Sequence, residues 1–277
     1  MDITEKKKLG QELHIFTKAL KWGANEIELL GTGSQAVQKY PSDFDFFSSI
    51  KGDRDVKKMF AELQRILRRA QETNEMTFIE LKVQRKDGEK QKFYEPWFSE
   101  EQFTKAVGDP SGLDFIKIDY VVFVRETNEL TELSIIYSFS GMPPVADLVK
   151  KIKEDYEHYR DEGKVYKSLK RMYSIYRLKG NKEKLVELSQ LFNSSTGAKY
   201  KASSNLKAIE LLAEHRPDDR DVEKKIRVNL DDLGNQLGVA KINTLSQVKK
   251  LSAKLDKEIE AETKKWLESH KSVLPSN

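Results

Sequence analysis

The sequence of 277 residues contains no cysteine, which excludes a disulfide framework and a thiolate metal site. Its four histidines are scattered without the paired spacing of zinc ligands, so a zinc site of that kind is excluded as well. No apolar run approaches the length of a transmembrane helix, and the first residues lack the apolar stretch of a signal peptide. From these absences we expect an intracellular, cytoplasmic protein without a membrane partner.

Charge is abundant but nearly balanced. Charged residues make up 34% of the chain, and the formal net charge is +4. This mild basicity is compatible with a nucleic-acid partner and does not require one. The length allows one large domain or two modest ones.

Two carboxylates alternate with aromatic residues early in the chain. Residues 26–30 alternate as a strand does, and further along Asp43 and Asp45 alternate with Phe44 and Phe46. Successive side chains of a strand point to opposite faces, so we expect both carboxylates on one face and both rings in a core. Two such like charges repel each other unless a cation bridges them, and oxygen ligands suit Mg²⁺ or Mn²⁺.

A glycine turn precedes these carboxylates. Gly33 and Ser34 are placed to offer backbone N–H groups to phosphates. Together with Asp43 and Asp45, they predict a site for a metal ion and a nucleotide.

This combination resembles the nucleotidyltransferase superfamily typified by DNA polymerase β. The resemblance lies in Gly33 and Ser34 followed, after a short loop, by Asp43 and Asp45 between hydrophobic positions. The preceding Pro41-Ser42 pair resembles the template-independent members, such as poly(A) polymerases. The resemblance implies an α+β fold, in which a mixed β-sheet nucleotidyltransferase domain with flanking helices is followed by an all-α helical domain.

The resemblance also implies a third carboxylate on a neighbouring strand. Asp119 is our candidate, because it interrupts the otherwise apolar strand predicted over 115–124, which should be central and buried. A carboxylate there is costly unless it is paired or bound to metal. Asp114 is the rival candidate, at the end of a glycine-containing loop. Glu80 alternates with apolar residues and shares its face with Lys82, so we expect it to face solvent.

Further elements follow from the apolar periodicity, and the chain divides into two predicted domains. Residues 1–142 form the catalytic domain and residues 143–277 the helical domain, with the boundary at consecutive prolines. A long charged helix with an apolar seam is predicted over 241–271. Packing on the helical domain is the favoured account of this seam, and a homodimer contact, a partner subunit or an RNA-facing helix are the alternatives. The catalytic domain is predicted to contain helices over 9–20 and 56–70 and strands over 78–83, near Phe93, over 115–124 and over 133–139.

Basic residues cluster on the helix predicted after Lys164. In the resembled family, basic side chains of the helical domain reach the triphosphate, and Lys167, Lys170 and Arg171 are the candidates for that role here.

The activity implied by the resemblance is template-independent addition of nucleotides, most simply AMP from ATP, to the 3′ end of a single-stranded RNA. Asp43, Asp45 and Asp119 would hold two Mg²⁺ or Mn²⁺ ions, and Asp119 would also accept the proton of the attacking hydroxyl. A compact catalytic half followed by a helical half also resembles enzymes of large DNA viruses. The alternatives are adenylyl transfer to a small molecule or a protein, and a catalytically silent binding subunit that retains the fold.

Overall fold

A computed structural model of the chain describes residues 27–32, 43–50, 56–124, 130–139, 145–216 and 218–274. The helix predicted over 9–20 and the prolines at positions 143 and 144 lie outside the described residues.

The chain forms two compact units. The first contains a β-sheet, two helices and the segment Leu211–Asn229, and the second contains the described residues of 145–210 and 230–274. The predicted boundary between residues 142 and 143 did not anticipate that Leu211–Asn229, called the 211–229 segment below, groups with the sheet.

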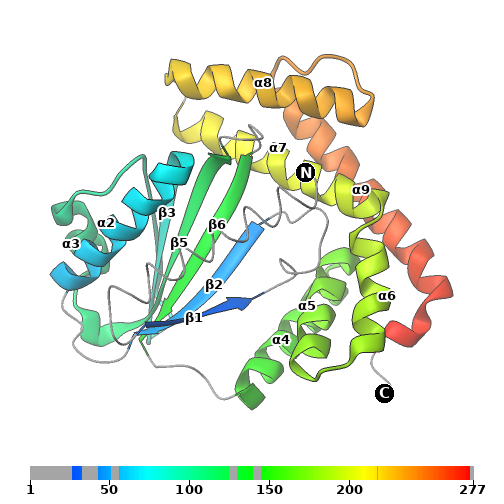
Figure 1. The fold of residues 1–277 in the computed structure, drawn as a ribbon, viewed down its shortest axis with the longest axis horizontal. Coiled ribbons are helices and arrows are strands. Elements are labelled where there is room, and N and C mark those ends of the chain that lie inside the picture. Colours follow the sequence, from blue (N-terminus) through cyan, green and yellow to red (C-terminus); the bar gives the residue numbers. More distant parts are fainter. Residues whose placement is uncertain are drawn as a thin grey trace. The chain divides into compact units, whose positions relative to one another are not determined.

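The sheet has six strands in the order β1-β2-β6-β5-β3-β4 (Figure 1). Strands β2 and β6 are parallel, whereas β6 with β5, β5 with β3, and β3 with β4 are antiparallel. The mixed sheet expected from the sequence is therefore confirmed, and β5 lies in its interior as predicted. The strands are β1 (Ile27–Thr32), β2 (Asp43–Ile50), β3 (Asn74–Arg85), β4 (Lys90–Glu95), β5 (Leu113–Val124) and β6 (Leu130–Ser138).

One face of the sheet carries the hydrophobic core. Helices α2 (Val56–Thr73) and α3 (Glu100–Val107) lie on the same side of the sheet (Figure 1). Their apolar side chains pack against alternate residues of β3 and β5, as the period-2 pattern requires. The core includes Phe60, Leu63, Leu67, Ile79, Leu81, Phe103, Ile116, Ile118 and Tyr120.

Helix α3 was not predicted. It is only eight residues long, but Ser99 and Gln102 form a reciprocal capping box at its start. The 3₁₀ turn η1 (Pro110–Gly112) then leads into β5.

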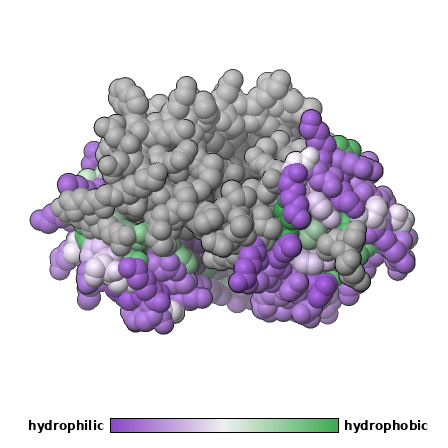
Figure 2. Space-filling model, turned by 90° about the horizontal axis from the view of Figure 1, so that it is seen from below, coloured by the Kyte–Doolittle hydropathy of each residue, from purple (hydrophilic) through white to green (hydrophobic). Residues whose placement is uncertain are grey.

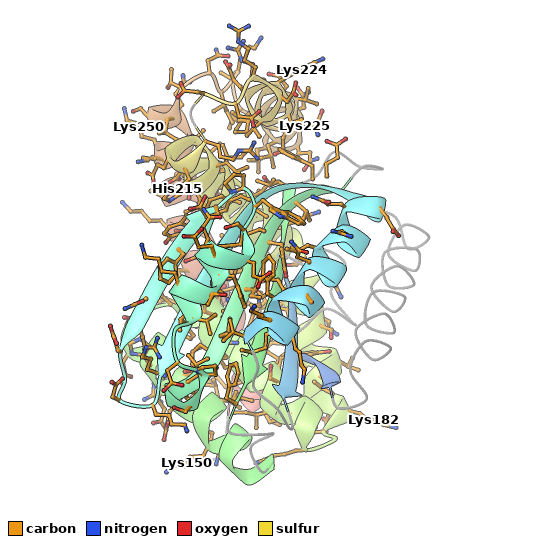
Figure 3. All side chains as sticks on the ribbon, turned by 90° about the vertical axis from the view of Figure 1, so that its left-hand side faces the viewer. Lys150, Lys182, His215, Lys224, Lys225 and Lys250 are labelled. Atoms are coloured by element: carbon orange, nitrogen blue, oxygen red, sulfur yellow. The ribbon has the colours of Figure 1, made fainter. Side chains whose placement is uncertain are left out.

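The 211–229 segment covers one end of the opposite face. The ring of His215 stacks on Tyr94 with centroids 4.2 Å apart, and it lies 5.4 Å from the ring of Phe78. The Lys225 ammonium lies 5.6 Å from the centre of a phenylalanine ring on β5. His215 and Lys225 are both labelled in Figure 3. These contacts explain why the segment belongs to the sheet's unit.

The second half of the chain is helical, as predicted. Its helices are α4 (Val145–Asp161), α5 (Val165–Leu178), α6 (Lys182–Phe192), α7 (Ser195–His215), α8 (Arg220–Leu237) and α9 (Leu245–Ser269), followed by the 3₁₀ turn η2 (Lys271–Val273). The ends of the two units fall within α7 and α8.

The connection between α6 and α7 consists of Asn193 and Ser194 alone. The Ser194 hydroxyl accepts a hydrogen bond from the N–H of Thr196, and α7 has already begun at Ser195. A Cβ atom at Gly197 would lie 1.9 Å from the carbonyl oxygen of Phe192. Only glycine therefore permits this close approach of backbone to backbone.

Helix α9 packs within the helical unit. Its residues Val248, Leu255 and Ile259 are buried. A carboxylate oxygen of Glu260 accepts hydrogen bonds from the backbone N–H groups of Val165, at 2.6 Å, and the next residue, at the start of α5. This confirms the favoured account of the apolar seam.

Hydrophilic residues predominate over the coloured surface in Figure 2. Among the helices that the structure describes, none is both long enough and apolar enough to cross a membrane.

Candidate functional site

The face of the sheet opposite the core carries a row of polar positions. Asp45 on β2 is the register partner of Ser134 on β6. Ser134 is in turn the partner of Asp119 on β5, and Asp119 is the partner of Glu80 on β3. Cross-strand partners lie on the same face. Asp43 lies two residues from Asp45 along β2 and shares that face by alternation. The structure thus places the backbone positions of the three predicted carboxylates on one face.

Asp119 is almost fully buried, with 1% of the residue exposed. Its Oδ1 atom accepts hydrogen bonds from the Ser134 hydroxyl and from the Lys117 ammonium at 2.8 Å, and its Oδ2 atom accepts one from the Lys82 ammonium at 2.5 Å. A buried carboxylate requires such partners. In the described structure, ammonium groups therefore balance the charge of Asp119.

These contacts determine how the cluster titrates. Burial by itself raises the pKa of Asp119, but Lys117 and Lys82 outweigh it and hold the pKa below its ordinary value. Burial by itself lowers the pKa of Lys82, but Asp119 and Glu80 outweigh it and raise the pKa. Asp119 and Lys82 are therefore both ionised at neutral pH. The depressed pKa also makes Asp119 a weak base, which does not favour its predicted role as proton acceptor.

The expectation that Glu80 faces solvent was wrong. Glu80 is buried, with 8% of the residue exposed, and its carboxylate lies 3.0 Å from the Lys82 ammonium and 3.3 Å from that of Lys92. Alternation assigns a residue to a face but does not say whether that face is covered. Strand β3 lies between β5 and β4, so lysines from its own strand and from β4 surround this carboxylate.

Three lysines occupy the adjacent row. Lys92 on β4 is the register partner of Lys82 on β3, and Lys82 is the partner of Lys117 on β5. We call these three residues the lysine row. Like charges directly opposite one another destabilise a sheet. The neighbouring carboxylates of Glu80 and Asp119 compensate for two of the three ammonium charges, which leaves one net positive charge.

An acidic residue that the sequence interpretation did not consider lies on the other side of this face. Glu132 on β6 is the register partner of Asp43. Asp43, Asp45 and Glu132 therefore occupy β2 and β6, whereas the lysine row occupies β5, β3 and β4. Two strand spacings, about 10 Å, separate the backbone of Asp45 from that of Asp119. Glu132 comes directly before the strand predicted over 133–139, so its charge lay outside the predicted element.

Carboxylate oxygens on this face have the chemistry of Mg²⁺ or Mn²⁺ ligands. Asp119 fits by ligand type and by face, although ammonium and hydroxyl donors contact its oxygens. Among the side chains that the structure describes, no three potential ligands come together as a metal site, and those of Asp43 and Asp45 are outside that set.

Two other sequence candidates have different outcomes. Gly33 and Ser34 lie outside the described residues. Asp114, the rival of Asp119, is at the start of β5, where its carboxylate accepts a hydrogen bond from the Gln84 amide at 3.2 Å.

The predicted triphosphate-binding residues lie on one face of α5. The cationic groups of Lys167 and Arg171 each lie 5.6 Å from the centre of the Tyr159 ring, and the Lys170 ammonium lies 4.9 Å from that of the Tyr200 ring. Burial lowers the pKa of Lys167. The three residues come together as basic groups on aromatic rings, and their role in binding phosphate stays a prediction.

No protein-family model and no curated protein matches the chain. Solved structures do resemble it. The M. chilensis Mg662 protein in complex with GTP has a TM-score of 0.59 at 9% identity, with 89% of this chain and 88% of that chain covered. A protein described as a new nucleotidyl transferase encoded by a Megaviridae ORFan gene has a TM-score of 0.59 at 10% identity, with coverages of 90% and 86%. A second structure of that description has a TM-score of 0.53 at 9% identity and covers 95% of each chain. At these identities the comparison shows the fold alone, so the predicted α+β fold, with a mixed sheet followed by helices, is confirmed.

Proposed function

We propose that the chain transfers a nucleotidyl group from a nucleoside triphosphate with the help of Mg²⁺ or Mn²⁺. The observation that carries this proposal is the row of Asp45, Ser134 and Asp119 across the sheet, on the face that also holds Asp43. The row occurs in a fold shared with a GTP complex and with proteins described as nucleotidyl transferases, which supports the same chemistry here.

The charges on this face suit a triphosphate with its metal ion. Carboxylate-bearing positions on β2 and β6 would attract the cation, and the lysine row on β5, β3 and β4 would attract the phosphates. A cation alone would neutralise only the carboxylates, and a phosphate group alone would neutralise only the lysine row. A metal–triphosphate complex matches both halves, because it combines a divalent cation with an extended anion.

The reaction follows from these roles. The acceptor hydroxyl would attack the α-phosphorus, the bond from this phosphorus to the bridging oxygen would break, and pyrophosphate would leave. Bound metal would polarise the phosphate and lower the pKa of the attacking hydroxyl. Asp43, Asp45 and Asp119 would hold it. Gly33 and Ser34 would bind the outer phosphates and position the nucleotide.

The acceptor we propose is the 3′ end of a single-stranded RNA, extended without a template by AMP from ATP. The basic and aromatic residues of α5 and its neighbours support an RNA partner, since single strands bind surfaces that combine the two. The mild net basicity of the chain agrees with this acceptor.

The test is incubation with Mg²⁺ or Mn²⁺, a short RNA and each labelled nucleoside triphosphate in turn. A ladder of extended RNA that forms best with ATP is expected. Label on the protein or on a small acceptor would replace the RNA proposal with adenylyl transfer, and no turnover with either metal would favour a silent subunit.

Matched variants test the site itself. Asp43→Asn and Asp45→Asn should each lower the transfer rate at least about a hundredfold, because each removes a carboxylate that would hold the metal ion. Asp87→Asn is the control: Asp87 is exposed in the turn before β4 and accepts a backbone hydrogen bond that asparagine retains. Metal-dependent transfer at the original rate in both site variants would refute the assignment.

A further inference from the structure

The lysine row carries more positive charge than the two carboxylates beside it compensate. Three ammonium groups are aligned across β4, β3 and β5, an arrangement that costs stability in a sheet. Among the described residues, the Lys117 ammonium contacts one acceptor, Asp119, although an ammonium has three donors. The side chains of Lys117 and Lys82 are 25% and 27% exposed, so both ammonium groups remain within reach of a solute.

We propose that Lys82 and Lys117 bind the polyphosphate group of a nucleotide, a role for which the sequence had suggested Gly33, Ser34 and the basic residues of the helical unit. This inference rests on the proposed function in that the ligand is a triphosphate. Phosphate oxygens would accept the remaining donors and neutralise the net positive charge beside Glu80 and Asp119. Lysine binds phosphate as a point charge with rotatable donors, so it tolerates the varied geometry of a flexible polyphosphate.

Asp119 is the positioning residue for these lysines. It contacts one ammonium group through each oxygen, at 2.8 Å and 2.5 Å, and is itself held by Ser134. The same oxygens are the ones that a cation would use. An ammonium that moves from Asp119 to phosphate therefore frees an oxygen for a cation, and the binding of polyphosphate and of metal should favour each other reciprocally.

The first experiment measures binding of inorganic tripolyphosphate without divalent metal by calorimetry. Lys117→Met and Lys82→Met should each weaken binding about tenfold, the loss expected for one charge-assisted hydrogen bond, and Lys117→Arg should retain most of it. Lys105→Met is the matched control. Lys105 is exposed on α3, so its substitution removes the same charge from the opposite side of the sheet. Binding by both site variants equal to that of the control would overturn the proposal.

The second experiment measures Mn²⁺ binding without nucleotide by electron paramagnetic resonance. Lys117→Met should bind Mn²⁺ more tightly, because it removes a competitor for Asp119. A folding defect would weaken the binding of both tripolyphosphate and Mn²⁺. Opposite changes in the two affinities therefore support the site and exclude a merely structural role. Weaker binding of both ligands, in a variant with the circular dichroism of the original protein, would overturn the shared use of Asp119.

The two experiments separate this inference from the proposed function. If tripolyphosphate binding falls while Mn²⁺ binding does not change, the polyphosphate site stands and the metal role of Asp119 fails. If tripolyphosphate binding falls and no nucleotidyl transfer occurs with any acceptor, the site stands and the proposed reaction fails.

Discussion

Replacing Asp119 with asparagine tests the central electrostatic argument. The substitution keeps the volume and an acceptor for the Ser134 hydroxyl, but leaves the ammonium groups of Lys82 and Lys117 without their shared carboxylate. Removing one partner of a buried ion pair costs about 3–5 kcal/mol. Both lysine side chains are about a quarter exposed, so water recovers part of this loss. We expect a destabilisation of about 2–3 kcal/mol.

The assay must report on the sheet alone, because two units need not unfold in one transition. Hydrogen exchange of the β5 amides meets this need, since β5 lies inside the sheet. Urea unfolding followed through these amides gives the free energy of unfolding of the original protein and of the variant. An apolar control, with Lys82, Asp119 and Lys117 all replaced by residues of similar volume, should recover most of the loss, because it leaves no charge unpaired.

The pH dependence has a definite sign. The folded pKa of Asp119 lies below its ordinary value, so its contribution is complete above about pH 4 and is lost as the pH falls through the folded pKa. The folded pKa of Lys82 is raised, so its contribution is complete below about pH 10 and is lost as the pH rises through that pKa. The difference between the original protein and Asp119→Asn should therefore be constant between these limits. A variant as stable as the original protein at neutral pH would refute the reasoning.

The remaining predictions concern single contacts. Glu260→Ala should cost about 1–2 kcal/mol by thermal denaturation, since it removes the acceptor at the start of α5. Glu260→Gln should cost less, because burial raises the pKa of Glu260 and disfavours its charge, and equal losses would contradict this. Gly197→Ala should destabilise the helical unit by more than about 1 kcal/mol through collision with Phe192, whereas Gly234→Ala, which meets no such contact, should be neutral or stabilising. His215→Ala should speed hydrogen exchange in the 211–229 segment through loss of about 1 kcal/mol of stacking, and unchanged exchange would refute that role.

Local patterns predicted most of the secondary structure. A nearly continuous apolar run predicted a strand over 115–124, and β5 spans Leu113–Val124. Apolar residues at helical spacing predicted a helix over 56–70, and α2 spans Val56–Thr73. Helix α3 was not predicted because, with eight residues, it is too short to repeat its apolar spacing.

A site residue could be predicted only where its polarity differs from that of its neighbours in the sequence. Asp119 stands in an apolar strand, and the structure does bury it and pair it. Glu80 stands in an alternating pattern that suits a solvent-facing strand equally well, so the sequence offered no reason to bury it. The difference depends on which strands flank β3, and strand order is a long-range property that periodicity does not contain.

The lysine row divides in the same way into a local part and a long-range part. Lys82 and Lys92 are equally far from Asp87 at the centre of the turn, so hairpin geometry alone makes them partners. Lys117 joins them only because β5 returns beside β3 after α3 and η1, with a register shift near Gln84. That long-range pairing aligns the third ammonium and brings Lys82 to Asp119. The hairpin alone already pairs two lysines around one glutamate, which leaves a surplus of one positive charge. The register of β5 adds Lys117 together with Asp119, so it keeps this surplus and places a third ammonium beside the buried carboxylate.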